Sequence, residues 1–555
     1  MKQRLSPLAM SLCLLGFVTL PVCAATSDQA LENKVAQLEQ QLAELKSQIK
    51  PTHHSHHSAT HSKISTSRQG STQGLTPSEI KTTAEISTIA GRAEAGEKEA
   101  EKKEPGITGP NYLPETGMQY LPVDVDVPGQ SFVSTGPYIG VPLQYSGSNL
   151  LINSPSVNQD VALLKLRKNI NERLAALGLK PSDEHAHLLL SGTVEGQVIY
   201  RNVGDSYRSS GKNSSDIDLT NVGIDAYILG PSTWTSGLIS LSYDNNIGAQ
   251  TGSLSINSRS QNSRVFVNKA FIVIGDFSRS PFYGTLGQMY VPFGTYSTSL
   301  VSSPLTKLLF RTQERALLLG FQQQCKNGFH GSLFAFKGDS YANTTNQINN
   351  GGINLGYFFD LGFFSGRFGG SYMGNVADSQ GMQNNGNGAI YVPPLTPIFG
   401  GFGGVAGTGS EKLVHRVPGY NVRGVFSLGK SVDLLAEYIA TTTQFSPADM
   451  TFKSHGAKLQ ALNAEAAYTF QGISKPTSVT LGYGMSKEAL AVGLPAQRWS
   501  AVLNTSIWRN TLQSLEFRHD INYAASAKSS GSMIPAAMVS GKSDNMVTAQ
   551  FDIYF

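Results

Sequence analysis

Alternating apolar and polar residues fill the chain from about His187 to Phe555. Because successive side chains of a strand point to opposite faces, each such run predicts a strand with one apolar and one polar face. In the last run, one face carries Val547, Ala549, Phe551, Ile553 and Phe555, and the other carries Thr548, Gln550, Asp552 and Tyr554. This alternation alone fits both a soluble β-sandwich and a membrane barrel.

The spacing of the runs favours the barrel. Short turns alternate with long polar connections, which is the pattern of short periplasmic turns and longer outer loops. The long connections lie near 203–214, 245–262, 293–313, 341–350, 376–413, 444–456, 487–496 and 525–542. We therefore predict an all-β fold over residues 186–555, a transmembrane antiparallel β-barrel of about 16 strands. A barrel of this width leaves an aqueous channel, which indicates transport. Phe551, Ile553 and Phe555 are expected to close it against the first strand.

The N-terminus predicts export. Lys2 and Arg4 precede the apolar run 8–22, and small residues before Ala25 offer a cleavage site, so residues 1–24 are expected to be a signal peptide. Lipidation at Cys23 is an alternative, although Val22 is bulky for such a site. Beyond residue 24 no apolar run is long enough for a transmembrane helix. The expected location is the bacterial outer membrane, with the N-terminal region in the periplasm.

Residues 25–50 predict a short coiled-coil helix. Its heptad seam consists of Leu31, Val35, Leu38, Leu42, Leu45 and Ile49, and Pro51 ends it. We expect this seam to bring copies of the chain together, most simply as a homotrimer. A single amphipathic helix lying on another surface is the alternative.

Two further segments precede the barrel. Residues 51–105 form a charged, His-rich linker that contains His53, His54, His56, His57 and His61. Imidazoles bind Zn, Cu and Ni, but no carboxylate or thiolate completes a site, so a solvated spacer is the alternative. Residues 106–185 form a pre-barrel segment with an amphipathic helix marked by Val161, Leu164, Ile170, Leu174 and Leu177. This helix could plug a pore or pack beneath one.

Composition fits this class of protein. The chain holds 57 Gly, 26 Phe and 21 Tyr with 15% charged residues, and its net charge is only +4. Positive and negative charges nearly balance, so the chain lacks the basic excess that is typical of nucleic-acid-binding proteins. Signal cleavage would leave Cys325 as the one cysteine, which excludes an intramolecular disulfide.

The whole layout resembles the legiobactin-receptor (LbtU) family of siderophore porins. The resemblance is carried by the signal, by the heptad helix that begins Leu31-Glu-Asn-Lys-Val-Ala-Gln-Leu, by the segment Ser280-Pro-Phe-Tyr-Gly-Thr-Leu-Gly-Gln-Met-Tyr-Val-Pro-Phe-Gly294 and by the terminal Phe551-Asp-Ile-Tyr-Phe555. It implies a 16-stranded outer-membrane barrel that takes up a ferric siderophore without an energy-coupling plug. The partners expected are outer-membrane lipid and lipopolysaccharide, the barrel-assembly machinery and a small-molecule solute. No cofactor and no nucleic acid are expected.

Candidate ligand or pore-lining residues lie in the third long connection and on the inner wall. Lys307 and Arg311, with Arg315 just beyond, would attract anionic solutes, although a solvated outer loop would also carry such charges. The wall candidates carry both signs and are Arg423, Glu437, Glu465, Glu516, Arg518 and Asp520. Such a wall filters solutes by field and size.

An enzyme is not expected, because His330, His415, His455 and His519 lack any recognisable Ser or Cys nucleophile motif. Two function classes therefore stay open. One is a transporter, either a siderophore porin or a general or anion-selective trimeric porin. The other is a structural envelope tether or surface adhesin.

Overall fold

The structure, a computed structural model, describes the barrel and one helix before it. The described residues are 112–113, 118–119, 133–134, 158–176, 187–202, 213–230, 232–244, 264–325, 327–342, 347–383, 402, 412–429, 431–472, 475–508, 511–524, 526–529 and 542–554. The chain divides into two compact units, residues 1–104 and 105–555, and all described residues belong to the second. The predicted signal peptide, heptad helix and histidine tract lie outside the described residues.

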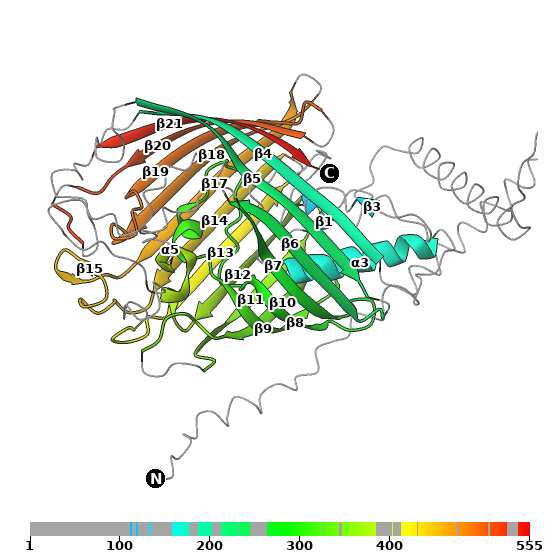
Figure 1. The fold of residues 1–555 in the computed structure, drawn as a ribbon. Helices are drawn as coiled ribbons and strands as arrows, with labels where there is room; N and C mark the ends of the chain where they lie inside the picture. The colour runs from blue at the N-terminus through cyan, green and yellow to red at the C-terminus, as the bar shows by residue number, and fades with distance from the viewer. Residues whose placement is uncertain are drawn as a thin grey trace, which may run out of the picture. The chain divides into compact units, whose positions relative to one another are not determined.

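Sixteen antiparallel strands form a closed barrel within the described residues (Figure 1). Each strand pairs with the next along the chain, and the last pairs with the first. The strands are β4 (His187–Asn202), β5 (Asn213–Leu229), β6 (Thr235–Asp244), β7 (Arg264–Gly275), β8 (Phe282–Tyr290), β9 (Gln313–Gln322), β10 (Gly328–Phe336), β11 (Asn350–Asp360), β12 (Phe364–Met373), β13 (Gly419–Leu428), β14 (Val432–Thr441), β17 (Gln460–Gly472), β18 (Lys475–Lys487), β19 (Gln497–Thr505), β20 (Thr511–Ile521) and β21 (Ser543–Tyr554). The predicted fold class is confirmed.

The closing seam follows the alternation of the last run. Asp552 of β21 lies opposite Glu195 of β4, and Gln550 lies opposite Gln197. The Gln197 Nε2 atom donates to Gln550 Oε1 across the seam. Phe551 and Ile553 are exposed on the outer face, whereas Asp552 and Gln550 are buried on the inner face. Phe555 itself lies outside the described residues.

The outer surface of the barrel is apolar. Every one of the sixteen strands carries at least one large apolar side chain that is exposed. In β9, for example, Leu317 and Leu319 are 48% and 59% exposed, whereas Ala316 and Leu318 are each 2% exposed. A soluble sandwich would hide such residues, while a membrane barrel places them against lipid. The exposed band therefore decides between the two folds that alternation leaves open.

Aromatic side chains gather on the outer face near the short-turn end of the barrel. Phe329 packs on Tyr357, Phe364 on Phe426, and Trp508 on Phe551. Toward the other end, Tyr420 packs on Tyr438 and Tyr483 on Trp499. Two aromatic girdles that flank an apolar band are typical of outer-membrane barrels. The fold is thus a porin-like outer-membrane β-barrel.

The two ends of the barrel differ as predicted. The connections at the end where β4 begins span only a few residues each, whereas those at the other end include 291–312, 374–418 and 442–459. The long connections carry their own small elements, which are listed with their bounds here: α4 (Leu305–Phe310), η2 (Val376–Asp378), α5 (Gln380–Gln383), β15 (Thr451–Phe452) and β16 (His455–Gly456).

A helix and three short strands precede the barrel in sequence. The strands are β1 (Tyr112–Leu113), β2 (Met118–Gln119) and β3 (Val133–Ser134), and β3 pairs in parallel with β4. The amphipathic helix expected around Val161 to Leu177 is α3 (Gln159–Ala176), and its first half packs against the inner wall. The sequence left open whether this helix plugs a pore or packs beneath one, and the structure gives it contacts with the inner wall. Among the described residues, no helix is both long and apolar enough to cross a membrane.

Candidate functional site: the loop folded into the barrel

The connection between β8 and β9, residues 291–312 and named L3 here, crosses the interior of the barrel. It leaves β8 and then contacts β14, β17, β19 and β20, strands on the other side of the ring. Gly294 and Tyr296 have φ of 95° and 56°, and these left-handed residues turn the chain inward. L3 then enters the short helix α4 and returns to β9.

Three wall glutamates hold the backbone of L3. Their side chains project inward from neighbouring parts of the wall, Glu437 from β14, Glu465 from β17 and Glu516 from β20. The backbone amides of Thr295 and Tyr296 donate to Glu437 at 2.7 and 3.0 Å.

The other two glutamates repeat this arrangement further along the loop. Ser299 donates its amide to Glu465 at 2.8 Å, and Thr298 donates its hydroxyl to the same carboxylate at 2.6 Å. Val301 and Ser302 donate their amides to Glu516 at 2.6 and 3.0 Å. Loop amides have no strand partner, so a carboxylate that accepts two of them satisfies groups that would be costly to bury unpaired.

The loop covers these glutamates almost completely. Glu437, Glu465 and Glu516 are 6%, 4% and 1% exposed. All three were predicted to be wall residues that meet solute, and the structure brings them together beneath L3 instead. Their contact with a ligand stays a prediction, but the contact that the structure gives them is with the loop.

Missing side chains on the wall make room for L3. Gly482 of β18 lies under Leu300, and a Cβ atom built on Gly482 would come within 2.6 Å of Leu300 Cδ1. A Cβ on Gly484 would lie 3.2 Å from Leu305 Cδ1. A side chain at Gly482 would therefore displace the end of Leu300.

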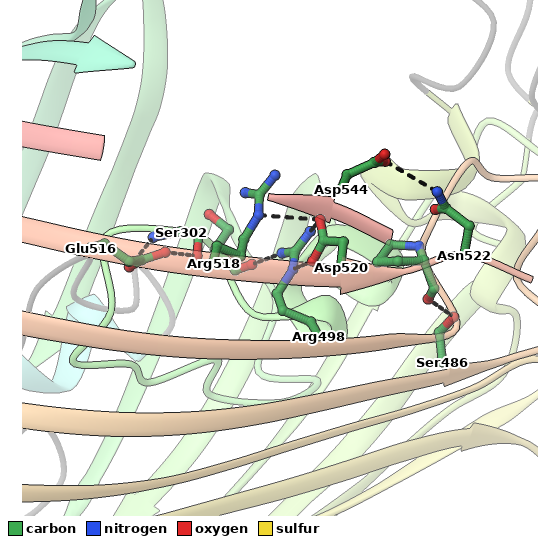
Figure 2. Close-up of polar contacts among 10 residues, drawn as sticks. Ser302, Ser486, Arg498, Glu516, Arg518, Asp520, Asn522 and Asp544 are labelled. Carbon is green, nitrogen blue, oxygen red and sulfur yellow. Dashed lines mark hydrogen bonds and ion pairs between the residues drawn. The ribbon is translucent and has the colours of Figure 1, made fainter. Parts of the chain in front are cut away.

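An arginine pair lies on the wall beside the anchored end of L3 (Figure 2). Arg498 of β19 binds Asp520 of β20 with two hydrogen bonds of 2.7 and 3.1 Å and also donates to the Ser303 carbonyl. Arg518 reaches the same carboxylate at 3.2 Å, as Figure 2 shows. Two guanidinium groups thus share one carboxylate. The side chain of Arg518 is 21% exposed, so its guanidinium lies partly open to the lumen.

Sequence reasoning found Arg518 and Asp520 but missed Arg498. The signal was present, because alternation over Gln497–Thr505 places Arg498 on the same face as Ser500 and Asn504. The amides of L3 left no comparable signal, since backbone donors have no sequence signature.

Arg423 lies further around the inner wall, on β13. It donates to Asn421 Oδ1 at 2.8 Å and to Asn354 Oδ1 of β11. In the strand register it stands directly opposite Glu437. Arg423 therefore joins the polar wall under the start of L3.

Two cations lie in the part of L3 that leads to β9. Arg311 lies over the Tyr290 ring, 4.6 Å from its centroid, and donates to Gln380 Oε1 at 2.7 Å. Lys307 of α4 is partly exposed. Burial, together with the neighbouring Arg311 charge, lowers the pKa of Lys307 to about 7, while the Glu195 carboxylate opposes this shift. Lys307 is thus poised to gain or lose its charge near neutral pH.

Arg315 is placed differently from the other predicted pore residues. It is exposed on β9 and shares a face with Leu317 and Leu319, which belong to the outer band. The strand period of two sends it away from the lumen. The prediction that Arg315 lines the pore is corrected accordingly.

The described residues hold no group of three or more His, Cys, Asp or Glu side chains that could bind a metal ion. The histidine tract predicted as a weak metal site lies outside them. Its role stays a prediction.

Solved structures resemble the chain in fold. An anion-selective porin from Comamonas acidovorans has a TM-score of 0.42 at 11% identity, over 67% of this chain and 100% of that one. The outer membrane channel DcaP of Acinetobacter baumannii has a TM-score of 0.42 at 12% identity, over 67% of this chain and 97% of that one. The barrel is established by its own strand pairing, and these likenesses carry no argument about its solute.

Relatives are recognised at the level of sequence. No family model matches the chain. A UPF0422 protein of Coxiella burnetii is 39% identical over 430 residues, which cover 77% of this chain and 84% of the relative. A UPF0422 protein of Legionella pneumophila (strain Lens) is 33% identical over 438 residues, which cover 76% of each chain. The chain belongs to the UPF0422 family.

Proposed function

We propose that this protein is an outer-membrane channel that admits small anionic solutes by passive diffusion. The observation that carries the proposal is L3 itself, a loop held across the interior by Glu437, Glu465 and Glu516. A barrel of 16 strands is wide enough for an aqueous channel, and an inward loop sets its narrowest section.

The distribution of charge supports anions as the solute class. The three glutamates lie beneath the loop, and their oxygens accept hydrogen bonds from loop amides and hydroxyls. Lys307, Arg311 and Arg518 keep part of their surface exposed. A solute in the narrow section therefore meets more positive than negative charge, which favours carboxylates and other anions.

The finer proposal is that the anion is a ferric siderophore. It is supported by the resemblance of the signal, of the 280–294 segment and of the chain terminus to siderophore porins. In this proposal the solute crosses without an energy-coupled receptor domain. A homotrimer held by the heptad seam at residues 31–49 belongs to the same proposal.

Planar-bilayer conductance of the purified full chain tests the channel. We expect discrete current steps and, in a KCl gradient, a reversal potential displaced toward that of chloride. A barrel that never conducts would overturn the transport function and favour the tether or adhesin. A ferric siderophore should block the current where neutral sugars and inorganic phosphate do not. Equal block by all of these solutes would contradict the siderophore proposal and support a general channel.

A matched pair of variants locates the selectivity. Lys307→Gln and Arg315→Gln each remove one cation, the first on α4 in the interior and the second on the outer face. Lys307→Gln should reduce the anion preference, whereas Arg315→Gln should leave it unchanged. An equal effect of both changes would show that net charge, and not L3, sets the preference.

A further inference from the structure

An apolar patch interrupts the inner wall at the short-turn end of the barrel. It consists of buried, inward-facing side chains of three strands: Tyr227 and Leu229 of β5, Leu238 of β6, and Phe271 and Val273 of β7. The inner wall of a water-filled barrel is normally polar. An apolar patch on this wall is stable only if another part of the protein shields it from water.

The first half of α3 is that cover. Val161, Leu163, Leu164 and Leu166 are buried and belong to the same apolar cluster as the wall patch. Leu164 packs against the end of β7, because its Cδ1 atom would lie 3.4 Å from a Cβ atom built on Gly275. The helix and the wall patch therefore belong to one continuous apolar core inside the barrel.

Polar contacts fix the helix at three heights. Deepest, Thr285 of β8 donates its hydroxyl to Asp160 Oδ2 at 2.8 Å. One turn further on, the Tyr227 hydroxyl donates to the Leu163 carbonyl at 3.0 Å. At the rim, Arg167 donates to the Ser232 carbonyl at 2.6 Å and to Ser236 Oγ at 2.8 Å.

Arg167 also donates to the carbonyls of Gly230 and Thr235. Its guanidinium thus binds the turn after β5 and the first two residues of β6. Beyond this residue the helix leaves the wall, and in Figure 1 its second half extends past the strand ends. Lys168 and Glu172, which form an i,i+4 pair 3.8 Å apart, have side chains 27% and 61% exposed.

The helix reaches well around the ring. Lys165 Nζ lies 5.8 Å from the ring centroid of Phe358, which belongs to β11. From β5 to β11 the pairing order runs through seven of the sixteen strands. α3 therefore lies against the wall from β5 to β8, and the side chain of Lys165 reaches from it across the lumen toward β11.

We propose that α3 is a built-in plug that narrows the short-turn mouth of the barrel, with Arg167 as its latch. The inference rests on the proposed channel function. It adds a second restriction at the opposite end from the long loops. The current through the channel is then set by how firmly α3 stays seated as well as by L3.

The test compares two variants of the same helix in the full chain. Arg167→Ala removes the contacts with Gly230, Ser232, Thr235 and Ser236, while Lys168→Ala removes an equal charge whose ion pair, with Glu172, lies within the helix. We expect a several-fold rise in single-channel conductance or open probability for Arg167→Ala and none for Lys168→Ala. Heat-modifiable gel mobility confirms that each barrel is folded. If Arg167→Ala does not fold, Tyr227→Phe, which loses the bond to Leu163, takes its place.

A second readout follows the seat of α3 directly. Val273→Cys, in a Cys325→Ser background, places a thiol in the wall patch beneath the helix at a site that is now buried. A hydrophilic maleimide should label it slowly when Arg167 is intact and many-fold faster with Arg167→Ala.

The outcomes distinguish the plug role of α3 from the latch role of Arg167. Faster labelling without a change in conductance would overturn the plug, because the helix would then cover the wall without restricting flow. Unchanged labelling and unchanged conductance would overturn the latch. If neither the parent protein nor any variant conducts while labelling still responds to Arg167→Ala, the channel function is wrong. The position of α3 against the wall, held by Arg167, is then still supported.

Discussion

The Glu516 carboxylate accepts a hydrogen bond from the backbone amide of Val301 at 2.6 Å, although 215 residues separate the two along the chain. Glu516 belongs to β20 and Val301 to a loop that starts at β8, so the loop crosses the interior of the barrel to make this bond. One buried acid thereby fixes the tip of the loop that narrows it.

Removing this anchor should loosen L3. Glu516→Ala leaves the amides of Val301 and Ser302 without their acceptor, and each lost bond to a charged group costs about 1.5–3 kcal/mol. Single-channel recordings should show larger and noisier currents. Asp433→Asn is the control, because this inward carboxylate of β14 bonds Ser427 instead of L3. Identical currents for the two variants would contradict an anchoring role.

A larger side chain on the wall beneath L3 should also displace the loop. Gly482→Val would force Leu300 away from β18, because even a Cβ atom there comes within 2.6 Å of it. We expect an altered conductance with the barrel still folded. Gly196→Ala serves as the comparison, since nothing lies within 4 Å of a Cβ at Gly196. A current unchanged by Gly482→Val would show that L3 does not limit the channel.

The anion preference should depend on pH through Lys307. With a pKa of about 7, Lys307 is about 90% charged at pH 6 and about 10% charged at pH 8. The charge that attracts anions is therefore gained as pH falls, so the reversal potential in a KCl gradient should move toward that of chloride between pH 8 and pH 6. Lys307→Gln should remove this step. If the variant keeps the full pH-dependent change in reversal potential, another titratable group causes it.

The shared carboxylate of the arginine pair should matter for stability. Asp520→Asn leaves Arg498 and Arg518 without their counter-charge, and breaking a buried ion pair costs about 3–5 kcal/mol. Asp544→Asn, which changes the carboxylate opposite it in the strand register, should cost less, because Asn522, which donates to Asp544 at 3.1 Å, is a neutral donor. Thermal unfolding in detergent compares the two. A larger loss for Asp544→Asn would refute the pairing argument.

Oligomerisation should depend on the heptad segment. Deleting residues 27–50 removes the apolar seam, so we expect fewer subunits per particle while the barrel still folds. Light scattering in detergent measures the subunit number, and heat-modifiable gel mobility reports the barrel. An unchanged subunit number would show that the seam does not hold the subunits together.

Alternation made the barrel predictable. A strand repeats every two residues, so the outward positions of Leu317, Phe551 and Ile553 can be read from their neighbours. The same rule, applied to single positions, places Arg315 outside and Arg498 inside. Those two residues were therefore within reach of the sequence, and the prediction missed them by following charge instead of register.

The sequence determined the sixteen strands, the lipid-facing band and the contrast between short and long connections, because these follow from local periodicity and turn chemistry. Only the tertiary structure decided what fills the barrel. The bonds from L3 to Glu437, Glu465 and Glu516, and from Arg167 to the turn after β5, join residues far apart in the chain through backbone groups. Backbone amides and carbonyls are the same at every position, so no pattern of side chains announces which of them a buried charge will meet.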